Sequence, residues 1–453
     1  MHTAFSGLNS QVRSIQRSRI EGRVSAVGGL ALSATGLDRA AGLGDRVRVH
    51  GRRGPVEGEV VAIDAARLSI LPFGDWDGVA IGDGVEVLGP AVLTPDDSWI
   101  GHVLDALGRP YGPQSRFFEG AEPRPVRAAP PPAFGRRRVG ARLETGIRAL
   151  DIFAPICRGQ RMGVFAGSGV GKSTLMAMLA RQTDAEVIVI GLVGERGREL
   201  QDFIEEDLGP EGMARAVVIA ATGDESPLMR RQAAWTATAV AEHFRDRGKQ
   251  VLLMLDSVTR FAMAQREIGL SAGEPPTAKG YPPTVFAELP RLLERAGPGP
   301  RGAGDITALF TVLVDGDDHN EPISDAVRGI TDGHVVLERR IAERGRYPAV
   351  NLQRSLSRML PGCHSEIDYA IMDAARRAMA RYADMEDLIR IGAYRHGSDP
   401  ETDQALAFAE PAERFLSQRK GEATGSAEAF AALYGLLHAA GVPVELPPAA
   451  PPA

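Results

Sequence analysis

The chain has 453 residues, of which 44% are apolar and 24% are charged, and its formal net charge is −6. This length predicts two or three domains, and the composition is typical of a soluble globular protein. The net charge argues against a protein that coats nucleic acid, and no apolar run approaches the ~20 residues of a membrane span.

Residues 1–20 show a weak amphipathic pattern, with Val12, Ile15 and Ile20 placed among arginines. Such a segment is either a frayed terminus or a docking helix for a partner or an anionic membrane surface. It lacks the pattern of a signal peptide, and Cys157 and Cys363 lie far apart without the spacing of a metal site. We therefore expect a reducing, cytoplasmic setting.

Residues 21–93 read as a separate β domain. Polar and apolar side chains alternate strictly at 44–49, and further short apolar runs occur at 60–63, 68–71 and 85–88. Turns rich in glycine and aspartate separate these runs, a pattern that favours a small antiparallel barrel or sandwich. The Pro- and Arg-rich segment 122–138 predicts an irregular connection across a domain surface.

A glycine-rich loop follows the apolar run 162–165 and precedes a stretch with helical character. Its residues are Ala166, Gly167, Ser168, Gly169, Val170, Gly171, Lys172, Ser173 and Thr174. Strand, glycine turn and helix in this order predict a P-loop that cradles the phosphates of a nucleotide. Lys172 supplies a full positive charge, and Ser173 is placed to offer its hydroxyl to Mg²⁺. The strict pattern opens with glycine, so Ala166 is a departure that affects the first turn.

Strands and helices alternate through the central region, which predicts an α/β P-loop NTPase domain over residues 94–360. Buried parallel strands are expected at 187–193, 216–220 and 251–256, and a helix at about 227–247. Ligands of such sheets bind beyond the carboxyl ends of the strands. Glu195 and Asp256 are therefore expected at the same edge of the sheet as the P-loop.

Asp256 closes an apolar run and completes a Walker-B pattern, whose acid holds Mg²⁺ directly or through water. In many P-loop ATPases the next residue is an acid that orients the attacking water, but here it is Ser257. Glu195 is therefore the expected general base. The alternative is a surface carboxylate that pairs with Arg196 or Arg198.

Cations around the γ-phosphate matter because phosphoryl transfer depends on positioning and on charge stabilisation. Arg196, Arg260 and Arg358 are the candidates. Each of them could instead be a structural ion-pair partner.

The pattern from about residue 361 predicts a C-terminal helical domain that ends near residue 442. Two apolar stripes have helical spacing, namely Ile367, Ala370, Ile371, Ala374 and Ala378, and then Phe430, Leu433, Leu436 and Leu437. This spacing is typical of helices that face a core. The Pro- and Ala-rich tail, residues 443–453, is expected to be disordered.

Several segments resemble the rotary F1-type ATPases, namely 255–262, 274–276, 280–286, 347–350 and 355–358. Within that family, residues 194–199 resemble the protein-export ATPases of type III secretion more than the ATP synthase β subunit. Residues 316–322 and 391–400 are similar to the flagellar branch of these export ATPases. The resemblance runs from about residue 20 to residue 440. It implies a RecA/F1-like P-loop core with an N-terminal antiparallel β-barrel and a C-terminal helical domain.

The resemblance also implies an activity and a site. The chain would hydrolyse ATP to ADP with Mg²⁺ and energise the export of flagellar proteins. Lys172 and Ser173 would bind phosphate and Mg²⁺, and Glu195 would activate water. Arg196 would lie near the γ-phosphate and Arg260 follows the Walker-B acid, while Tyr347 would stack on adenine. Arg358 would be an arginine finger that reaches into a neighbour's site.

The implied partners follow from the same family. One chain carries both the P-loop and the finger, so six copies in a ring could complete their own sites. Other implied partners are an export regulator at the N-terminal segment, a coiled-coil stalk in the ring, the export gate, chaperones and export substrates. No nucleic acid is expected, and the chain would associate peripherally with the inner-membrane export apparatus.

Four alternatives stay open at this point. A virulence-type secretion ATPase differs from the flagellar type only in short motifs, and a rotary ATP synthase subunit is disfavoured by Gly197 and residues 391–400. A hexameric RNA translocase would need exposed aromatics between basic residues, whereas residues 22–93 hold only Phe73 and Trp76, close to a turn. A ring member that binds nucleotide without hydrolysis is disfavoured by Glu195.

Overall fold

The computed structural model describes residues 21–64, 67–112, 116–314 and 321–446. The predicted docking segment 1–20, most of the tail and residues 316–320 of the flagellar-type motif lie outside these residues. Contacts between Cα atoms divide the chain into two compact units. One holds the described residues up to Val92 with Glu225–Met229 and Ala264–Thr284, and the other holds Leu93–Asp224, Arg230–Met263 and Val285 onward. The predicted domain boundaries stay predictions.

The N-terminal strands close into an antiparallel barrel, which decides between the barrel and the sandwich. The strands are β1 (Glu21–Gly28), β2 (Ala31–Thr35), β3 (Arg46–Gly51), β4 (Gly54–Asp64), β5 (Arg67–Pro72) and β6 (Gly84–Gly89). Their order around the barrel is β1-β2-β5-β4-β3-β6. The alternation in β3 buries Val47 and Val49 completely, because successive side chains of a strand point to opposite faces. The barrel core therefore follows from the period-two pattern.

The central sheet is mostly parallel, as predicted. Its strands are β8 (Val103–Leu104), β10 (Arg161–Ala166), β11 (Val187–Glu195), β12 (Ala216–Thr222), β13 (Gln250–Asp256), β15 (Asp305–Leu313), β16 (Gly333–Leu337) and β17 (Leu356–Ser357). Their order is β17-β16-β10-β15-β13-β11-β12-β8, and β14 (Gly297–Pro298) pairs with β15. The short strands β7 (Val92–Leu93) and β9 (Arg124–Pro125) lie outside this sheet. The P-loop strand β10 and the Walker-B strand β13 are thus separated by β15 alone.

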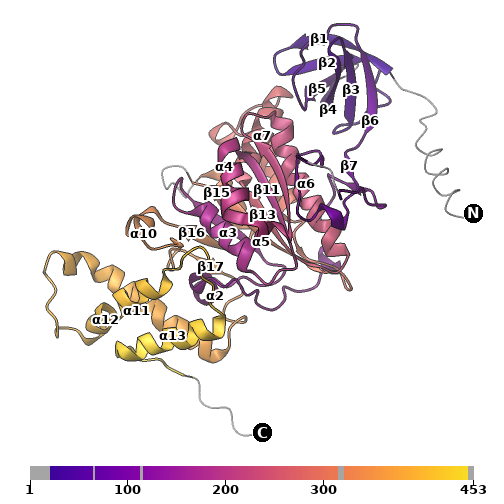
Figure 1. The fold of residues 1–453 in the computed structure, drawn as a ribbon. Coiled ribbons are helices and arrows are strands. Elements are labelled where there is room, and N and C mark those ends of the chain that lie inside the picture. Colours follow the sequence, from indigo (N-terminus) through magenta and orange to yellow (C-terminus); the bar gives the residue numbers. More distant parts are fainter. Residues whose placement is uncertain (1–20, 65–66, 113–115, 315–320, 447–453) are drawn as a thin grey trace, which may run out of the picture. The chain divides into compact units, whose positions relative to one another are not determined.

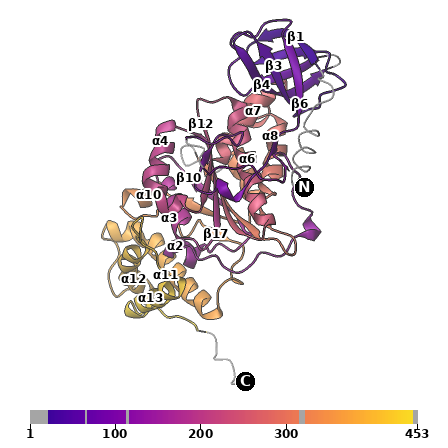
Figure 2. The ribbon, with the colours of Figure 1, turned by 45° about the vertical axis from the view of Figure 1, so that its right-hand side comes forward.

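Helices cover both faces of the sheet, with α3 on one face and α6 on the other (Figures 1 and 2). A Cβ added at Gly191 of β11 would lie 3.0 Å from Ala237 of α6, so glycine permits this close approach. The helices are α2 (Arg148–Phe153), α3 (Lys172–Gln182), α4 (Gly197–Asp202), α5 (Gly209–Met213), α6 (Pro227–Asp246), α7 (Val258–Ser271), α8 (Pro283–Leu293), α9 (Pro322–Ile330) and α10 (Arg339–Glu343). Short 3-10 helices occur at η1 (Asp97–Trp99), η2 (Ala133–Gly135) and η4 (Ala278–Gly280), and η3 (Phe203–Leu208) is a π-helix that directly follows α4.

The Pro- and Arg-rich segment is an irregular connection whose arginines bind their own domain. Arg136 donates to the carbonyl of Ala296 at 3.2 Å, and Arg137 donates to the carboxylate of Asp305 at 2.7 Å. The guanidinium of Arg127 lies 4.3 Å from the ring centroid of Trp235, a cation–π contact. The arginines therefore hold the connection against the sheet domain.

Three helices form the C-terminal region, α11 (Glu366–Arg390), α12 (Pro400–Leu416) and α13 (Ser426–Ala439). The side chains of Ser365 and Asp399 cap the first turns of α11 and α12 by accepting from backbone N–H groups. The predicted stripes are largely confirmed, with Ile371, Ala374, Ala378, Phe430, Leu433 and Leu437 buried. Ile367 is the exception at 54% exposed, because the first turn of α11 faces an open cavity of about 430 Å³. None of the described helices is both long and apolar enough to cross a bilayer.

Candidate active site at the carboxyl edge of the sheet

The glycine-rich loop joins β10 to α3 in the way that its sequence predicts. Gly169 and Gly171 have φ angles of 75° and 90°, in the left-handed region that favours glycine. Ala166 is still part of β10, where it pairs with Leu313 and Leu337. Its departure from the glycine pattern therefore falls on a strand residue that needs no glycine conformation.

Lys172, at the first position of α3, lies between two carboxylates. Its Nζ is 2.5 Å from Oδ1 of Asp256 and 3.3 Å from Oε1 of Glu195. Burial by itself would lower the pKa of Lys172, but the two carboxylates outweigh it and raise that pKa above its ordinary value. The ammonium is therefore charged at neutral pH, as a phosphate ligand requires.

The topology of the sheet explains why these three residues meet. β11 pairs in parallel with β13, with Leu192 opposite Asp256, so Glu195 ends next to the Walker-B acid. β10 and β13 flank β15, and all four strands run in one direction. Their carboxyl ends therefore lie at one edge, where ligands of such sheets bind.

Glu195 has the electrostatic character of a general base. Burial raises the pKa of Glu195 above its ordinary value, Asp256 raises it further, and Lys172 acts in the opposite direction. A carboxylate with a raised pKa accepts a proton more readily than an exposed one. The alternative pairing is wrong, because Arg196 binds Glu199 and Arg198 lies 3.7 Å from Asp202.

The three candidate arginines are placed very differently. Arg260, in the first turn of α7, packs its side chain over Gly194, and its charge lowers the pKa of Glu195. The side chain of Arg196 is 85% exposed and does not join the Lys172 cluster. Arg358 follows β17 and is exposed, at the opposite edge of the sheet, where its N–H donates to the carbonyl of Asp332.

Tyr347 lies beside the P-loop. A Cβ added at Gly171 would be 3.1 Å from two atoms of the Tyr347 ring, so the ring lies against the loop. Tyr347 is 37% exposed. An aromatic face next to the phosphate loop offers a surface on which a base can stack.

Three residues near the site escaped the sequence analysis. The hydroxyl of Thr311, on β15, donates to Oδ1 of Asp256 at 2.7 Å. Arg339 donates to the carbonyl of Ser168 in the P-loop at 3.0 Å, and the N–H of Gln418 donates to the carbonyl of Tyr347 at 2.7 Å. A threonine within the apolar run 306–314 was a usable signal, whereas Arg339 and Gln418 carry no signal in the sequence.

Comparison with known proteins identifies the family. The ATP synthase alpha/beta family, nucleotide-binding domain, matches residues 146–357, and the T3SS EscN ATPase C-terminal domain matches residues 364–435. A flagellum-specific ATP synthase from Caulobacter vibrioides is 51% identical, over 95% of this chain and 98% of the relative. The chain belongs to the flagellum-specific ATP synthase family. It is an ATP-binding ATPase of the type III secretion class, as the resemblance predicted.

Solved structures of a type III secretion ATPase have the same fold as this chain. The assembled ATPase EscN of the enteropathogenic E. coli type III secretion system has a TM-score of 0.85 at 37% identity, covering 92% of this chain and all of EscN. EscN in complex with its central stalk EscO has a TM-score of 0.84 with the same identity and coverage. The F1/EscN-like fold class is thereby confirmed.

The family assignment argues against a rotary synthase subunit, and the aromatic residues of the barrel argue against an RNA translocase. The match of residues 364–435 to a secretion ATPase domain separates this flagellum-specific ATPase from the rotary synthase subunits. Phe73 is 8% exposed, and Trp76 is half-buried against the barrel core. Neither aromatic ring offers the open platform that single-stranded RNA requires.

Proposed function

We propose that this chain hydrolyses ATP with Mg²⁺ to energise the export of flagellar proteins through a type III secretion apparatus. It works as a homohexameric ring with each active site shared between two subunits. The flagellar role, rather than a virulence role, is supported by the 51% identity to the flagellum-specific relative over 95% of this chain.

Nucleotide and metal sites are assigned to the carboxyl edge. The backbone of residues 167–174 binds the phosphates of ATP or ADP, Lys172 compensates their charge, and Tyr347 stacks on adenine. Ser173 and Asp256 suit Mg²⁺, which prefers oxygen ligands. Among the described residues, hydrogen bonds to Asp256 end on Oδ1, which leaves Oδ2 for a metal or its water. When bound, the ion would neutralise charge that develops between the β- and γ-phosphates.

Glu195 takes the proton of the attacking water. Its carboxylate borders the P-loop through Lys172, and its raised pKa favours proton uptake. Arriving phosphates compete with Glu195 and Asp256 for the Lys172 ammonium. Binding of ATP thus frees the Glu195 carboxylate for water, while Arg260, which packs beside Gly194, is placed to respond to the same charge. Arg196 would reach the γ-phosphate only after its exposed side chain turns toward the site.

The position of Arg358 is the observation that carries the shared site. In β17, Leu356 pairs with His334 and Ser357 with Gly333, antiparallel to β16, so Arg358 comes next to the start of β16. β16 runs from Gly333 to Leu337, about 16 Å at the usual rise per residue. The P-loop follows the carboxyl end of β10, which pairs in parallel with β16. Arg358 therefore lies at the sheet edge opposite its own P-loop and suits the site of the adjacent subunit.

The exposure of Arg358 agrees with this role. Its side chain makes no hydrogen bond or ion pair with any residue in the described part of the chain. An arginine finger supplied in trans is worth roughly 10³–10⁵ in rate. A cation held free for a neighbour would make the ring, rather than the single chain, the active unit.

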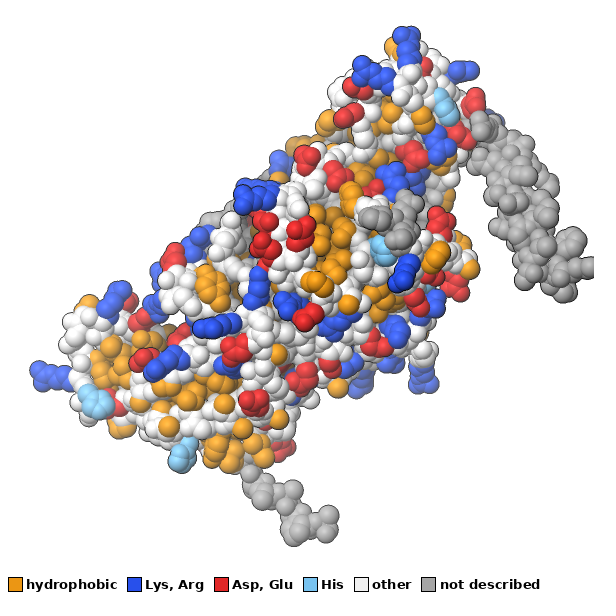
Figure 3. Space-filling model, viewed as in Figure 1, with side chains coloured by type: hydrophobic (Ala, Val, Ile, Leu, Met, Phe, Trp, Pro, Cys, Tyr) orange, Lys and Arg blue, Asp and Glu red, His pale blue; other side chains and the backbone are white. Residues whose placement is uncertain are grey.

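The further partners are proposed from the family. EscN assembles and binds a central stalk, EscO, and by analogy this chain would hold a coiled-coil stalk in its ring. Figure 3 shows hydrophobic side chains on the surface of the C-terminal helical region. The exposed apolar residues of this region include Leu388, Ile391 and Tyr434. Such side chains suit chaperones and export substrates. A regulator at residues 1–20 and the export gate would keep the ring at the cytoplasmic side of the inner membrane.

Mixed rings test the shared site. Arg358→Ala and Lys172→Ala chains are each expected to lose turnover, and a mixture of the two to recover part of it, because some interfaces then pair an intact P-loop with an intact finger. Arg354→Ala removes a neighbouring exposed arginine and should turn over normally. ATP hydrolysis is measured after mixed assembly is verified with two affinity tags. Mixed rings as inactive as both parents would exclude action in trans, and secretion of flagellar proteins by cells carrying each variant tests the export role.

A further inference from the structure

Residues 338–349, here called the strap, follow β16 and contain α10. The N–H of Glu338 donates to the carbonyl of Ala349 at 3.0 Å, so the two ends of the strap are joined to each other. None of the residues of α10 is buried. Specific contacts, rather than a core of its own, therefore hold the strap in place. These contacts reach the P-loop on one side and the C-terminal helices on the other.

The first contact is with the backbone of the P-loop. Nη2 of Arg339 donates to the carbonyl of Ser168 at 3.0 Å. This carbonyl and the N–H of Gly169 belong to one planar peptide group and point in opposite directions. Gly169 has a φ of 75°, and a glycine lets such a peptide group rotate at little steric cost. The bond from Arg339 therefore fixes the direction of an N–H group in a loop that binds phosphate through its N–H groups.

The second contact places the ring of Tyr347 against Gly171 of the same loop. Arg346, the residue before it, is buried, and its Nη2 donates to the carbonyl of Val350 at 2.8 Å. Nε of Arg346 lies 2.7 Å from Oε2 of Glu413 on α12. A buried guanidinium is costly to leave without its carboxylate partner. The backbone that carries the Tyr347 ring is therefore anchored to α12.

The segment after α12 holds Tyr347 from a second side. The carbonyl of Tyr347 accepts from the N–H of Gln418 at 2.7 Å. The side chain of Gln418 is buried, and its Nε2 donates to the carbonyl of Gly146 at 2.9 Å. Its Oε1 accepts from the N–H of Arg148 at 2.8 Å. Gln418 is thus itself fixed to the segment before β10, and the Tyr347 backbone is held at two points.

We propose that Arg339 and Arg346 are positioning residues for ATP at opposite ends of the strap. Arg339 shapes the P-loop for the phosphates, and Arg346 holds the Tyr347 ring for the base. The base end rests on the stacking role proposed above for Tyr347, whereas the phosphate end rests on the P-loop alone. None of the contacts described for the strap involves the Lys172 cluster. The strap therefore governs the affinity for nucleotide more than the chemical step.

Arg339→Ala in the full-length chain tests the phosphate end. The KM for ATP should rise by about 2- to 10-fold, the worth of one hydrogen bond, while kcat stays near that of the parent. Arg339→Lys keeps a donor and should recover part of this loss. The inhibition constants of ADP and of inorganic pyrophosphate should rise together, because both ligands bind through phosphates. Arg340→Ala removes the next exposed arginine and is the matched control. A KM no higher than in this control would overturn the role of Arg339.

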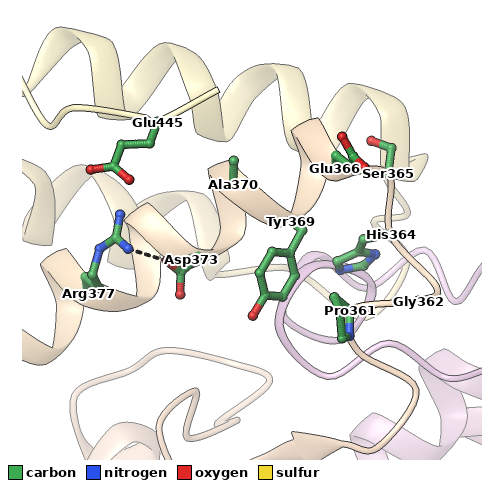
Figure 4. Close-up of a pocket in the computed structure, with 10 residues that line it drawn as sticks. All are labelled: Pro361, Gly362, His364, Ser365, Glu366, Tyr369, Ala370, Asp373, Arg377 and Glu445. Atoms are coloured by element: carbon green, nitrogen blue, oxygen red, sulfur yellow. Dashed lines mark hydrogen bonds and ion pairs between the residues drawn. The ribbon is translucent and has the colours of Figure 1, made fainter. Parts of the chain in front are cut away.

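Glu413→Ala tests the base end, because it removes the partly exposed anchor of Arg346. The inhibition constant of ADP should rise by about 2- to 10-fold. That of pyrophosphate should stay unchanged, because pyrophosphate has no base. Asp373→Ala is the matched control and should bind both ligands as the parent does. Figure 4 shows that Asp373 pairs with Arg377 beside a cavity of about 480 Å³, so this variant breaks an arginine–carboxylate pair within α11.

The outcomes separate the two ends of the strap. Unchanged ADP inhibition in Glu413→Ala, or an equal rise for ADP and pyrophosphate, would overturn the role of Arg346. Normal ADP inhibition in a Tyr347→Ala chain would instead refute the proposed stacking, and the result for Arg339 would still stand. Circular dichroism checks that each variant folds. If Glu413→Ala does not fold, Arg346→Lys, which keeps the charge and loses the fork of the guanidinium, decides the same comparison.

Discussion

The hydroxyl of Thr311 donates to Oδ1 of Asp256 at 2.7 Å and so fixes the Walker-B acid from the neighbouring strand. Thr311 lies on β15, which separates the P-loop strand β10 from β13. Lys172 binds the same oxygen from the other side. Side chains from strand β15 and helix α3 therefore meet at one carboxylate oxygen of β13, and the orientation of this carboxylate decides where a metal ion can bind.

Thr311→Val tests this relationship, because valine keeps the shape and removes the hydroxyl. Asp256 would lose the bond that orients it, and removal of such supporting bonds costs about 10- to 100-fold in metal affinity or activity. We expect turnover to fall and the Mg²⁺ concentration for half-maximal turnover to rise. Thr311→Ser keeps the hydroxyl and should stay close to the parent, whereas equal losses in both variants would indicate a packing defect.

Glu195→Gln tests the general base. The amide cannot take a proton from water, and loss of such a base costs typically 10²- to 10⁴-fold in rate. Turnover should fall by that amount, while ATP binding measured by calorimetry should stay near normal. Glu199→Gln is a matched control, because Glu199 is exposed and pairs with Arg196. Near-normal turnover of Glu195→Gln would remove this residue from its proposed role.

The acid side of the pH–rate profile should report Glu195. Burial and the charge of Asp256 raise the pKa of Glu195, and the base works only when deprotonated. As pH falls, kcat/KM should therefore decline at a higher pH than an ordinary glutamate, at 4.5, would set. Stopped assays between about pH 5 and about pH 8 measure this limb. The residual activity of Glu195→Gln should lack it, and a parent profile flat down to the ordinary value would contradict the assignment.

Asp151 should make stability depend on pH. Burial raises the pKa of Asp151 from 3.8 to about 7, against the effect of hydrogen bonds from Thr145. The folded chain thus holds a proton that the unfolded chain releases near pH 3.8, so this stabilisation is complete below that pH and disappears as pH rises through about 7. At about 1.4 kcal/mol per pKa unit, the free energy of unfolding should fall by up to a few kcal/mol.

Asp151→Asn, a neutral side chain of the same shape, should lack this dependence. Urea unfolding at about pH 5.5 and at about pH 8 should show a smaller difference for the variant than for the parent. Asp387→Asn removes an exposed carboxylate and should behave as the parent does. An equal pH difference in the parent and in Asp151→Asn would show that other groups cause it.

Local patterns in the sequence predicted much of the fold. The P-loop, the strands that end at Glu195 and Asp256 and the C-terminal helices all depend on side-chain periods of 2 or 3.6 residues and on glycine turns. Those signals act over a few residues, and the structure retains them. Ile367 was wrongly predicted to face the core. Helical spacing predicts which side chains share one face of a helix, but not how far the helix packed against that face extends.

The candidate site was predictable where a motif carried it. Because Ser257 follows Asp256 where many P-loop ATPases have an acid, Glu195 was predicted to be the general base. The parallel order of the strands places Glu195 next to Lys172 in the structure. Thr311, Arg339 and Gln418 were missed because their contacts depend on strand order and on loops distant in sequence. Arg196 joined the expected cations by its place in a motif, yet its side chain extends into solvent.

The sequence by itself determined the fold class, the P-loop and the acids at the strand ends, because short-range periodicity and turn chemistry encode them. Only the tertiary structure decided which distant residues become neighbours. Arg358 reads in the chain as one arginine among many. The sheet order brings it to the edge opposite the P-loop, because the antiparallel β17 returns the chain to the start of β16. Contacts of that kind follow from the global path of the chain, which no local pattern contains.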